Sequence, residues 1–559
     1  MHFLTEQATT QARRWQVAVA VIAVAAGLLD IWLLLGLREL NPANLSWISG
    51  DPADYQIGWE FIRAGNIWHF PFTWIPRLDY PTGLSAAYLD PVPLAALVFR
   101  LLSPLLPAQF QYLGIYAAIC FCLQAWFGLK LTALFAKDDP FVTFLGGAFF
   151  LLSPVLTKEA YGHFALLSQW LILASLYYYF RISGDRSLRA DLLPFVVLCA
   201  IAAGIQPYFA LMTNVIGAAG AFHAWNIRRA KSAALSSAAW LLAQAAATLL
   251  SLMFFGFFVP GKTHFVGEGY SLYSMNLLAP INPQSPGALN PFSFPVVHGW
   301  TLAGYDYLGL GVLLLLFVAI ACAPRLLREL ASRKILPLVV ISILFTLLAL
   351  STEVSFADHV LFRIPTPQFV IDLLSWFRGS GRLFWPVHAL LMLGAIAGLC
   401  AAVPSRWLCR LVLAIALVIQ YFDIVSVRQG VAVAAAAEHA DPLRSPVWSG
   451  LPAHFHHLVI FPAWQCAGFL PGGMGAQAHL SHIAAESGMT LNSVYVSRQS
   501  ALTHKLDCVT MPAMVRRNGF VPDTAYVLAN PSLAKSRFPH ACRHVDGLDL
   551  CWRLPPGSP

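Results

Sequence analysis

The 559-residue sequence contains few charged residues. Asp, Glu, Lys and Arg make up 11% of it, against about 25% in soluble globular domains, and hydrophobic residues make up 58%. So few charges could not cover the surface of a water-soluble body of this size. The composition excludes a soluble enzyme, a disordered scaffold and a fibrous protein, and it predicts an α-helical polytopic membrane protein.

Signatures of several other protein classes are also missing. No two cysteines have the C-x-x-C spacing of common zinc sites, and the C-terminal part contains no glycine-rich phosphate loop and no nucleophile elbow. We find no inverted repeat of the kind that marks many transporters. The formal net charge of +8 comes largely from basic residues in short loops between apolar runs, which is a signal of membrane topology, so nucleic acid is not implied as a partner.

Apolar runs long enough to cross a hydrocarbon core of about 30 Å dominate the sequence. Arg13 and Arg14 precede the first run, and no small-residue cleavage pattern follows it, so we expect a retained anchor and a cytoplasmic N-terminus. About eleven transmembrane helices are predicted, near residues 15–37, 110–136, 140–156, 163–182, 191–206, 207–227, 233–258, 304–323, 335–351, 383–403 and 406–427.

One further apolar segment, residues 91–106, decides the topology. It contains Arg100 and a break at Ser103-Pro104. If this segment does not cross, the basic residues of the short loops fall on the cytoplasmic side with Arg13, as the positive-inside rule requires. We therefore expect residues 91–106 to form a helix that lies on the outer face of the membrane.

This topology predicts a multi-pass protein of the bacterial inner (cytoplasmic) membrane with two domains. Residues 1–427 would form the transmembrane domain, and residues 428–559 a periplasmic domain. The polar loops of the transmembrane domain that face outward are residues 38–109, 259–303 and 352–382. Every long polar segment is then in an oxidising compartment, where disulfide bonds persist.

Four of the ten cysteines lie in the predicted periplasmic domain. Asp546-Gly547 is a two-residue hairpin signal, and Cys542 and Cys551 are equidistant from it, so they should oppose each other across the hairpin. Counting outward from the turn makes them a non-hydrogen-bonded pair, which is close enough for a disulfide. Cys466 and Cys508 would form the second pair, and zinc binding is the alternative for the four thiols.

The predicted periplasmic domain alternates between two kinds of segment. Residues 458–461, 493–496 and 525–529 have the pattern of strands, whereas residues 475–487 and 510–518 have that of helices. A small α/β domain is therefore predicted. Because it lacks a phosphate loop and a nucleophile elbow, it could position an acceptor, bind another molecule or be purely structural.

The first outer loop contains the motif GDPADYQIGW at residues 50–59. Asp51 and Asp54 are three residues apart, which places both carboxylates on one side of a helical turn. Such a pair suits a general base with an orienting neighbour, or a weak divalent-metal site. The alternative is structural, because Asp51 followed by Pro52 is a common helix start in which Asp51 would be the N-cap.

Other polar side chains in the outer loops are candidates for substrate binding. Arg378 and Arg382 are four residues apart at the entry to a span, so they could hold a phosphate from two sides or simply extend from the interface into water. His163 could contact a phosphate or donate to a neighbouring carbonyl group. The remaining candidates are Asp90, Glu159, Glu268 and Asn276.

The arrangement as a whole resembles the GT-C superfamily of polyprenyl-phosphate-sugar-dependent glycosyltransferases. More narrowly, GDPADYQIGW, the Gly-His pair of KEAYGHFALL, YSMNLLAPINP and SGRLFWP resemble a bacterial GT-C-like membrane family without an assigned substrate. The resemblance extends over essentially the whole chain. It implies that Asp51 is the catalytic base, with Asp54 second, and that Arg382 or Arg378 engages the donor phosphate.

The sequence departs from the superfamily in two respects. The adjacent Asp-Glu pair of some members is absent, so metal dependence is not carried over, and no cofactor is certain although a divalent metal could take part. The sequon-reading motif of oligosaccharyltransferases is also absent, so asparagine-linked transfer is not implied.

The resemblance predicts an inverting transfer of a sugar from a polyprenyl-phosphate donor to a hydroxyl acceptor on an envelope glycan, a lipid or a protein. Membrane lipids would be the other partners. A lipid or glycan flippase and a structural membrane protein are the alternatives. A polar cavity at the middle of the membrane would favour transport, whereas ionisable residues that collect near Asp51 would favour transfer.

Overall fold

The structure is a computed structural model of the chain. It describes residues 2–66, 68–229, 231–259, 265–266, 270, 273–284, 289–290, 293–297, 304–322, 332–439, 441–496, 499–528 and 540–554.

The chain forms two compact units that do not follow its order. We call the first the helical unit, which comprises Met1–Pro42, Leu113–Leu249 and Glu268–Ala436. The second is the loop–sheet unit, which comprises Ala43–Tyr112, Leu250–Gly267 and Ala437–Pro559. Most of the predicted first outer loop therefore belongs to the same compact unit as the predicted periplasmic domain.

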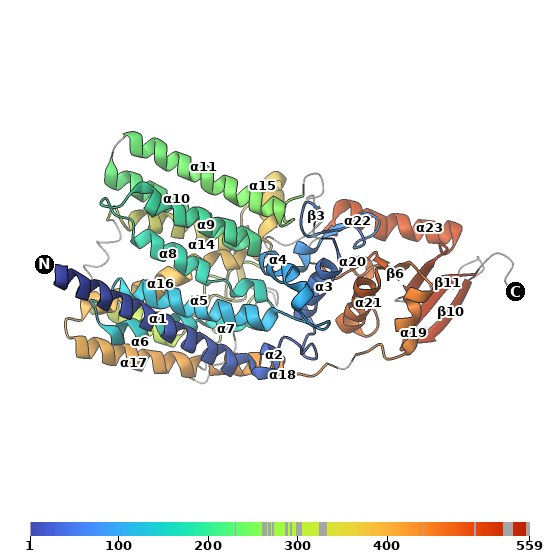
Figure 1. Ribbon diagram of the computed structural model, residues 1–559, viewed down its shortest axis with the longest axis horizontal. Coiled ribbons are helices and arrows are strands. Elements are labelled where there is room, and N and C mark those ends of the chain that lie inside the picture. Colours follow the sequence, from blue (N-terminus) through green and yellow to red (C-terminus); the bar gives the residue numbers. More distant parts are fainter. Residues whose placement is uncertain are drawn as a thin grey trace. The chain divides into compact units, whose positions relative to one another are not determined.

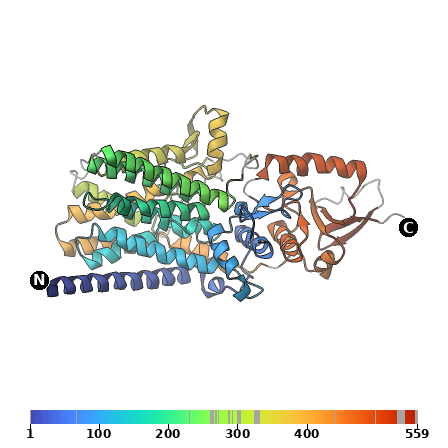
Figure 2. The ribbon, with the colours of Figure 1, turned by 45° about the horizontal axis from the view of Figure 1, so that its top comes forward.

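Long apolar helices that run side by side form the helical unit (Figures 1 and 2). Each of the eleven predicted spans contains a helix. The helices are α1 (His2–Leu35), α5 (Leu113–Ala133), α6 (Pro140–Leu151), α8 (Trp170–Phe180), α9 (Leu188–Ile205), α10 (Pro207–Arg228), α11 (Lys231–Phe254), α12 (Leu310–Cys322), α14 (Leu336–Leu350), α16 (Trp385–Ala402) and α17 (Arg406–Asp423), followed by α18 (Val425–Ala436).

Not all of these helices are long enough to cross a membrane unaided. Among the described residues, five helices have the required length and composition, and a sixth crossing results if α17 and α18, which meet at 45°, form one bent span. α6, α12 and α14 are apolar but shorter. The structure therefore agrees with a polytopic helical protein, and the number of eleven crossings stays a prediction.

The segment that decides the predicted topology forms a short helix. α4 (Pro93–Leu101) has nine residues, which span about 14 Å at 1.5 Å per residue. A 3₁₀ turn at Ser103–Leu105, which contains the predicted break, follows it. Arg100 donates from its guanidinium to the backbone carbonyl of Gly65 at 2.9 Å. A helix of this length reaches only half of a core of about 30 Å, in agreement with a segment that does not cross.

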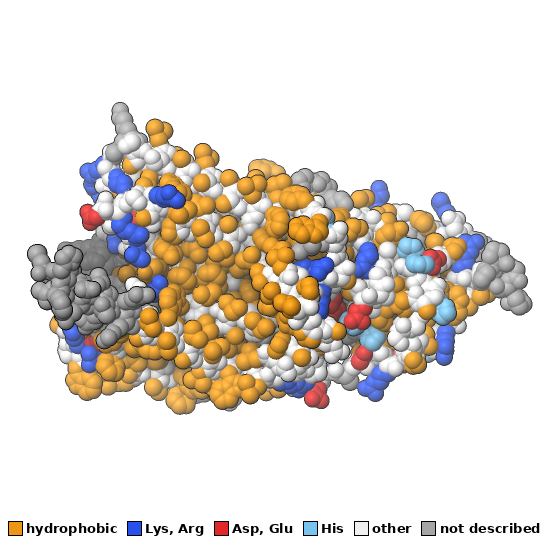
Figure 3. Space-filling model, viewed as in Figure 1, with side chains coloured by type: hydrophobic (Ala, Val, Ile, Leu, Met, Phe, Trp, Pro, Cys, Tyr) orange, Lys and Arg blue, Asp and Glu red, His pale blue; other side chains and the backbone are white. Residues whose placement is uncertain are grey.

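The surface of the helical unit is largely apolar. Hydrophobic side chains cover most of its visible face in Figure 3. The exposed large side chains of this unit include Leu235 and Leu242 of α11 and Trp407 of α17. Water would not stabilise such a surface, whereas lipid chains would, so this surface fits the membrane placement predicted from composition.

Carboxylates at the ends of the helices are paired with arginines. Asp30 of α1 lies 2.7 Å from a guanidinium nitrogen of Arg428 in α18, and Asp191 of α9 lies 2.7 Å from one of Arg228 in α10. Asp139, which caps α6 through the backbone N–H groups of Phe141 and Val142, is 2.9 Å from Arg410 of α17. Each pair joins two helices, which is a packing role.

A five-stranded sheet forms the core of the loop–sheet unit, with strand order β10-β11-β9-β6-β7. β6 (His457–Phe461) is parallel to β7 (Thr490–Leu491) and to β9 (Thr524–Leu528). β11 (Leu548–Arg553) pairs antiparallel with β9, and β10 (His540–Val545) pairs antiparallel with β11 at the edge of the sheet. Helices α21 (Gly473–Ser487) and α23 (Met511–Asn518) connect the strands. The predicted α/β character of this region is confirmed.

One predicted strand, residues 493–496, is absent. The backbone carbonyls of this segment accept hydrogen bonds from side chains. Gln477 donates to the Ser493 carbonyl at 2.7 Å, and both Gln465 and Trp464 donate to the Val494 carbonyl. These hydrogen bonds replace those of a sheet ladder, so the β-branched residues here follow an irregular path against α21.

The C-terminal hairpin forms as the sequence predicts. Asp546 and Gly547 both have positive φ, at 48° and 79°, as a two-residue hairpin turn requires. Cys542 and Cys551 are register partners with Cα atoms 4.1 Å apart, and they form a disulfide. Cys466 and Cys508 form the second disulfide, in agreement with the predicted pairing.

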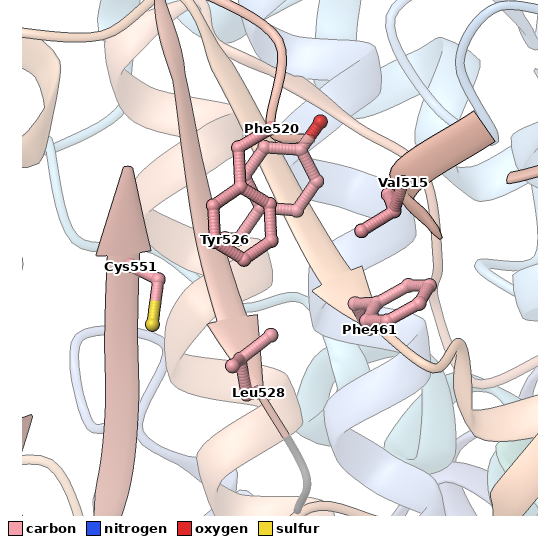
Figure 4. Packing of buried hydrophobic residues seen from close by; sticks show 6 residues of the cluster. All are labelled: Phe461, Val515, Phe520, Tyr526, Leu528 and Cys551. Carbon is pink, nitrogen blue, oxygen red and sulfur yellow. The ribbon is translucent and has the colours of Figure 1, made fainter. Parts of the chain in front are cut away.

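A hydrophobic cluster packs around Cys551 in the sheet (Figure 4). Phe461 of β6 and Tyr526 and Leu528 of β9 contribute to it, and Val515 of α23 adds a residue from the helical layer. The cluster thus joins the hairpin disulfide to the centre of the sheet.

The two disulfides should differ in their effect on stability. Cys466 and Cys508 are 42 residues apart, whereas Cys542 and Cys551 are 9 apart. The loss of denatured-state entropy corresponds to about 4 and about 3 kcal/mol respectively. We expect the double Cys→Ala variant of the first pair to increase amide exchange in β6 and β9 more than that of the second, as measured by hydrogen exchange with mass spectrometry. Equal effects, or the reverse order, would contradict the entropic account.

Candidate active site

The motif of the first outer loop begins helix α3 (Asp51–Ala64). Gly50, with φ of 62°, is the N-cap, and the N–H of Ala53 donates to the Gly50 carbonyl at 3.0 Å. Asp51 is therefore the first helical residue, and no side-chain hydrogen bond caps the helix. The alternative in which Asp51 is the N-cap is wrong, because Gly50 takes that position with a positive φ that glycine adopts readily.

Packing against α3 brings a third carboxylate to this end of the helix. Gly58 lies one turn beyond Asp54 on the same face, and a Cβ there would lie 3.1–3.2 Å from side-chain atoms of Leu89 and Pro91. The missing side chain lets the segment around Asp90 approach α3 closely. Asp51, Asp54 and Asp90 form what we call the carboxylate cluster.

The carboxylate cluster alters the electrostatics of Asp54. Burial, followed by the charges of Asp51 and Asp90, raises the pKa of Asp54 well above its ordinary value of 3.8. All three causes disfavour the carboxylate form, because a low-dielectric surrounding and like charges both penalise ionisation. Asp54 therefore tends to keep its proton beside the carboxylates of Asp51 and Asp90.

Hydrogen bonds to the end of the first loop hold α3 in place. The indole of Trp59 and the amide of Gln56 both donate to the carbonyl of Phe110 at 3.2 Å. The hydroxyl of Tyr112 donates to the carbonyl of Pro91, next to Asp90. Hydrogen bonds to residues 110–112 therefore hold both α3, which carries Asp51 and Asp54, and the segment that carries Asp90. This favours a fixed geometry of the three acidic side chains.

The C-terminal domain contacts the same helix. α21 packs along α3, and the imidazole of His482 donates from Nδ1 to the carboxylate of Glu60 at 2.9 Å. The hydrogen bond with Glu60 is the main cause that raises the pKa of His482 to about 9. The imidazole is then charged at neutral pH and forms an ion pair with Glu60 within the loop–sheet unit.

A separate group of basic residues lies in the helical unit. Arg378 donates to the hydroxyl of Tyr273 at 2.5 Å, and its guanidinium carbon is 4.8 Å from the centre of that ring. Arg382, in the 3₁₀ turn Ser380–Phe384, lies 5.7 Å from the ring of Tyr208. The backbone N–H of Gly379 donates to the Tyr208 hydroxyl at 2.6 Å, which fixes the segment between the two arginines.

Lys158, Glu159 and His163 adjoin these arginines. His163 Nδ1 is 3.0 Å from a carboxylate oxygen of Glu159. Burial alone would raise the pKa of Glu159, but His163, Arg382 and Lys158 lower it to about 2. Burial lowers the pKa of Lys158 to about 8, although Glu159 opposes the shift. We call Lys158, His163, Arg378 and Arg382 the basic cluster.

The sequence analysis missed two members of this region. Lys158 lies 4.2 Å from the ring centre of Tyr305 and 3.4 Å from the side-chain oxygen of Gln284. Asp306 is 0% exposed, and neither of its carboxylate oxygens has a hydrogen-bond partner in the described part of the chain. Lys158 lies in the motif that contains the Gly-His pair, and Asp306 lies at the start of the predicted span 304–323. Neither pattern by itself indicates a binding role for these two residues.

Two predicted binding residues lie elsewhere or outside the described chain. The amide of Asn276 donates to the Ser355 hydroxyl at 3.1 Å and to the Ala357 carbonyl at 2.9 Å, so it fastens the hairpin of β4 (Glu353–Phe356) and β5 (His359–Arg363). Glu268 falls outside the described residues. Within those residues, no group of three or more His, Cys, Asp and Glu side chains has the arrangement of a metal site.

Comparison with known families gives two matches. A family model described as a domain of unknown function (DUF6311) matches residues 24–425, and one described as the DUF6311 C-terminal domain matches residues 447–553. The description assigns no substrate, in agreement with the predicted resemblance to a family without one. A comparison with curated proteins gave no match.

Among solved structures, the chain is similar to an oligosaccharyltransferase of Archaeoglobus fulgidus. The apo form is 12% identical with a TM-score of 0.44, over 86% of this chain and 64% of that one. AglB from the same organism, in complex with an inhibitory peptide and a dolichol-phosphate, is 11% identical with a TM-score of 0.44, over 92% and 69%. This chain thus spans about two thirds of the length of these proteins.

The raised pKa of Asp54 should appear as a pH dependence of stability. The folded protein holds this proton to higher pH than the unfolded chain, so stability falls as pH rises from about 4 through the raised value. Asp54→Asn removes the penalty and should be more stable than wild type at pH 8 by about 1 kcal/mol or more. The difference should vanish toward pH 4 in thermal unfolding scans.

Asp546→Asn provides a control of opposite sign. Hydrogen bonds from the Ser445 backbone and the Trp448 indole lower the pKa of Asp546. Replacing this carboxylate by an amide should therefore reduce the stability of the protein at pH 8 and have little effect below pH 3. An Asp54→Asn variant that is less stable than wild type at every pH would contradict the raised pKa of Asp54.

Proposed function

We propose that this chain, which belongs to the family described as a domain of unknown function (DUF6311), is a membrane glycosyltransferase that uses a polyprenyl-phosphate sugar. It would transfer the sugar to a hydroxyl group of an envelope glycan, a lipid or a protein on the outer face of the membrane. The observation that supports this most is the basic cluster, whose arginines are held by tyrosines beside the apolar helices.

The basic cluster has the chemistry of a site for a lipid phosphate. Arg378 and Arg382 each present a guanidinium, which can form paired hydrogen bonds to phosphate oxygens. Lys158 adds an amine, and Glu159 holds His163 in place at 3.0 Å. The polyprenyl phosphate gains a second negative charge as its bond to the anomeric carbon breaks, so nearby cations stabilise it and no general acid is needed.

The carboxylate cluster supplies the base in this proposal. Asp51 would take the proton of the acceptor hydroxyl while that oxygen attacks the anomeric carbon from the face opposite the phosphate. Asp54 would act as its orienting neighbour, because its raised pKa favours the protonated form, which cannot accept that proton. One displacement inverts the anomeric centre, unlike the two-carboxylate scheme of retaining glycoside hydrolases.

The C-terminal domain would position the acceptor. Its helix α21 contacts α3 directly, and the ion pair between His482 and Glu60 joins them about two and a half turns from Asp51. A domain attached to the helix that carries the proposed base can set the distance between that base and a bound acceptor. This supports the acceptor-positioning role over a purely structural one.

Transport is the alternative, and the described helices favour it less. A transporter usually collects ionisable residues at the middle of its spans. In the described helices, Asp30 and Asp191 pair with arginines. The carboxylate cluster and the basic cluster belong to the predicted outer loops or to the entries of predicted spans. This distribution supports chemistry at the membrane surface.

Substitutions at the two clusters separate binding from turnover. Asp51→Asn should still bind the lipid donor but lose about 10²–10⁴ in transfer rate, because an amide cannot accept the proton. Asp54→Asn should keep much of the activity, since the amide resembles a protonated carboxyl. Arg382→Ala should weaken donor binding about 10- to 100-fold as well as turnover.

The measurement is transfer of radiolabelled sugar from extracted lipid donor, together with donor binding to the purified variants. Asp372→Asn, on the exposed helix α15 (Gln368–Leu374), is the control and should behave as wild type. Near-normal transfer by Asp51→Asn would remove it as the base. Unchanged donor binding by Arg382→Ala would remove the basic cluster from the donor site.

A further inference from the structure

A second pair of carboxylates is buried in the loop–sheet unit, away from the carboxylate cluster. Asp79 of the first outer loop is 1% exposed, and neither of its carboxylate oxygens has a hydrogen-bond partner among the described residues. Asp507 of the C-terminal domain is 2% exposed. Two such groups without compensation would strongly destabilise the fold.

Backbone pairing brings the two aspartates together from distant parts of the sequence. Leu78 forms a parallel bridge with Leu491 of β7, and the N–H of Tyr80 donates to the Leu491 carbonyl at 3.0 Å. The residues that follow this bridge are therefore Asp79 on one side and Asn492 on the other. The amide of Asn492 points to Asp507 Oδ1, 3.5 Å away.

A hydrogen bond between two threonines confirms this neighbourhood. The Thr82 hydroxyl donates to the Asp79 carbonyl at 2.6 Å, within the turn that Asp79 begins, and it lies 2.9 Å from the Thr503 hydroxyl. Thr503 is four residues before Asp507 in one continuous helical segment, so both side chains lie on nearly the same face. The turn of Asp79 thus lies over the face that carries Asp507.

The side chain of Gln499 adds another buried oxygen atom without a hydrogen-bond donor in the described part of the chain, next to Asp507. Its Nε2 donates to Asp507 Oδ2 at 3.1 Å, which puts its amide at the carboxylate pair. The other end of the amide, Oε1, is buried and has no hydrogen-bond partner among the described residues. Two oxygens of Asp79 and one of Gln499 are therefore buried acceptors without donors at one location.

No cationic side chain in the described chain neutralises the pair. Arg77 is nearest in sequence to Asp79, but its guanidinium donates to the carbonyls of Ala484 and Met489 at 3.0 and 3.2 Å. Lys505 is exposed. Burial and the charge of Asp507 raise the pKa of Asp79, and burial raises that of Asp507 to about 7. Either protons or a bound cation must compensate the charges.

We propose that Asp79, Asp507 and the Gln499 side-chain oxygen bind a calcium ion that joins the first outer loop to the C-terminal domain. Hard divalent cations take carboxylate and amide oxygens as ligands. Calcium fits better than magnesium here, because it gives up its water more readily and accepts irregular geometry, and the site is almost closed to solvent. This site is distinct from the proposed active site and does not depend on its chemistry.

The experiment measures calcium binding to the purified full-length protein in detergent. After treatment with EDTA and its removal, Ca²⁺ should raise the midpoint of thermal unfolding by roughly 3 °C or more and saturate at or below about 1 mM. Isothermal titration should give one Ca²⁺ per chain at this site. Mg²⁺ at the same concentration should give a clearly smaller shift.

Matched variants assign the effect to this site. Asp79→Asn and Asp507→Asn should lose the shift with Ca²⁺, and Gln499→Leu should weaken Ca²⁺ binding at least 10-fold. Glu486→Gln, an exposed position of α21, and Asp54→Asn, in the carboxylate cluster, should retain the shift. Retention in the last variant separates this site from any metal at the proposed active site.

A carboxyl pair neutralised by protons gives the opposite results. Wild type would then show no shift with Ca²⁺ or Mg²⁺, and its stability would decline as pH rises through 7, since the folded state holds the protons more tightly than the unfolded chain. Asp79→Asn would be as stable as EDTA-treated wild type, or more so. Either the absent shift in wild type or a normal shift in Asp79→Asn overturns the proposal.

Discussion

Charge is expensive in the hydrocarbon core of a membrane, and this constraint governs where the chain places its polar groups. An ionised side chain in the core must be paired or face water. The helices comply, because Asp30, Asp139 and Asp191 each have an arginine partner at a helix end. The carboxylate cluster, the basic cluster and the proposed calcium site lie instead outside the long apolar helices, on shorter helices and turns.

Apolar composition and turn chemistry made much of the fold predictable. Each expected span contains a helix because a long apolar run has few other structures in lipid. The hairpin disulfide follows from a turn with two positive φ angles, which sets the register of Cys542 and Cys551. These features are local, so the residues that determine them lie close together in the sequence.

Long-range contacts account for what was missed. Residues 493–496 look like a strand, but the side chains of Gln465 and Gln477 occupy their carbonyl groups. Lys158 gives no signal in the sequence, because its low pKa comes from burial that the fold creates. Likewise, only the tertiary structure joins the first outer loop to the C-terminal domain, since Leu78 pairs with a strand more than 400 residues away.

The candidate site was partly predictable for the same reason. Spacing alone identified Asp51 with Asp54, and both lie in the first turn of α3. It also identified Arg378 with Arg382, although they do not share a helix, because Gly379 separates the 3₁₀ turn that ends before Arg378 from the one that contains Arg382. Asp90 joins the carboxylate cluster only because Gly58 lets residues 89–91 pack closely against α3, and sequence spacing does not reveal this contact. Their catalytic and binding roles stay predictions, and the structure supports them by electrostatics and proximity within each unit.

Lipid-linked sugars in cells test the central claim most directly. Mass spectrometry would compare polyprenyl-phosphate sugars and envelope glycans from cells with the gene, without it, and with the Asp51→Asn variant alone. A glycosyltransferase of this type predicts that deletion and Asp51→Asn both accumulate one lipid-phosphate sugar and remove that sugar from one envelope product. An unchanged lipid pool together with unchanged glycans in both strains would contradict the account.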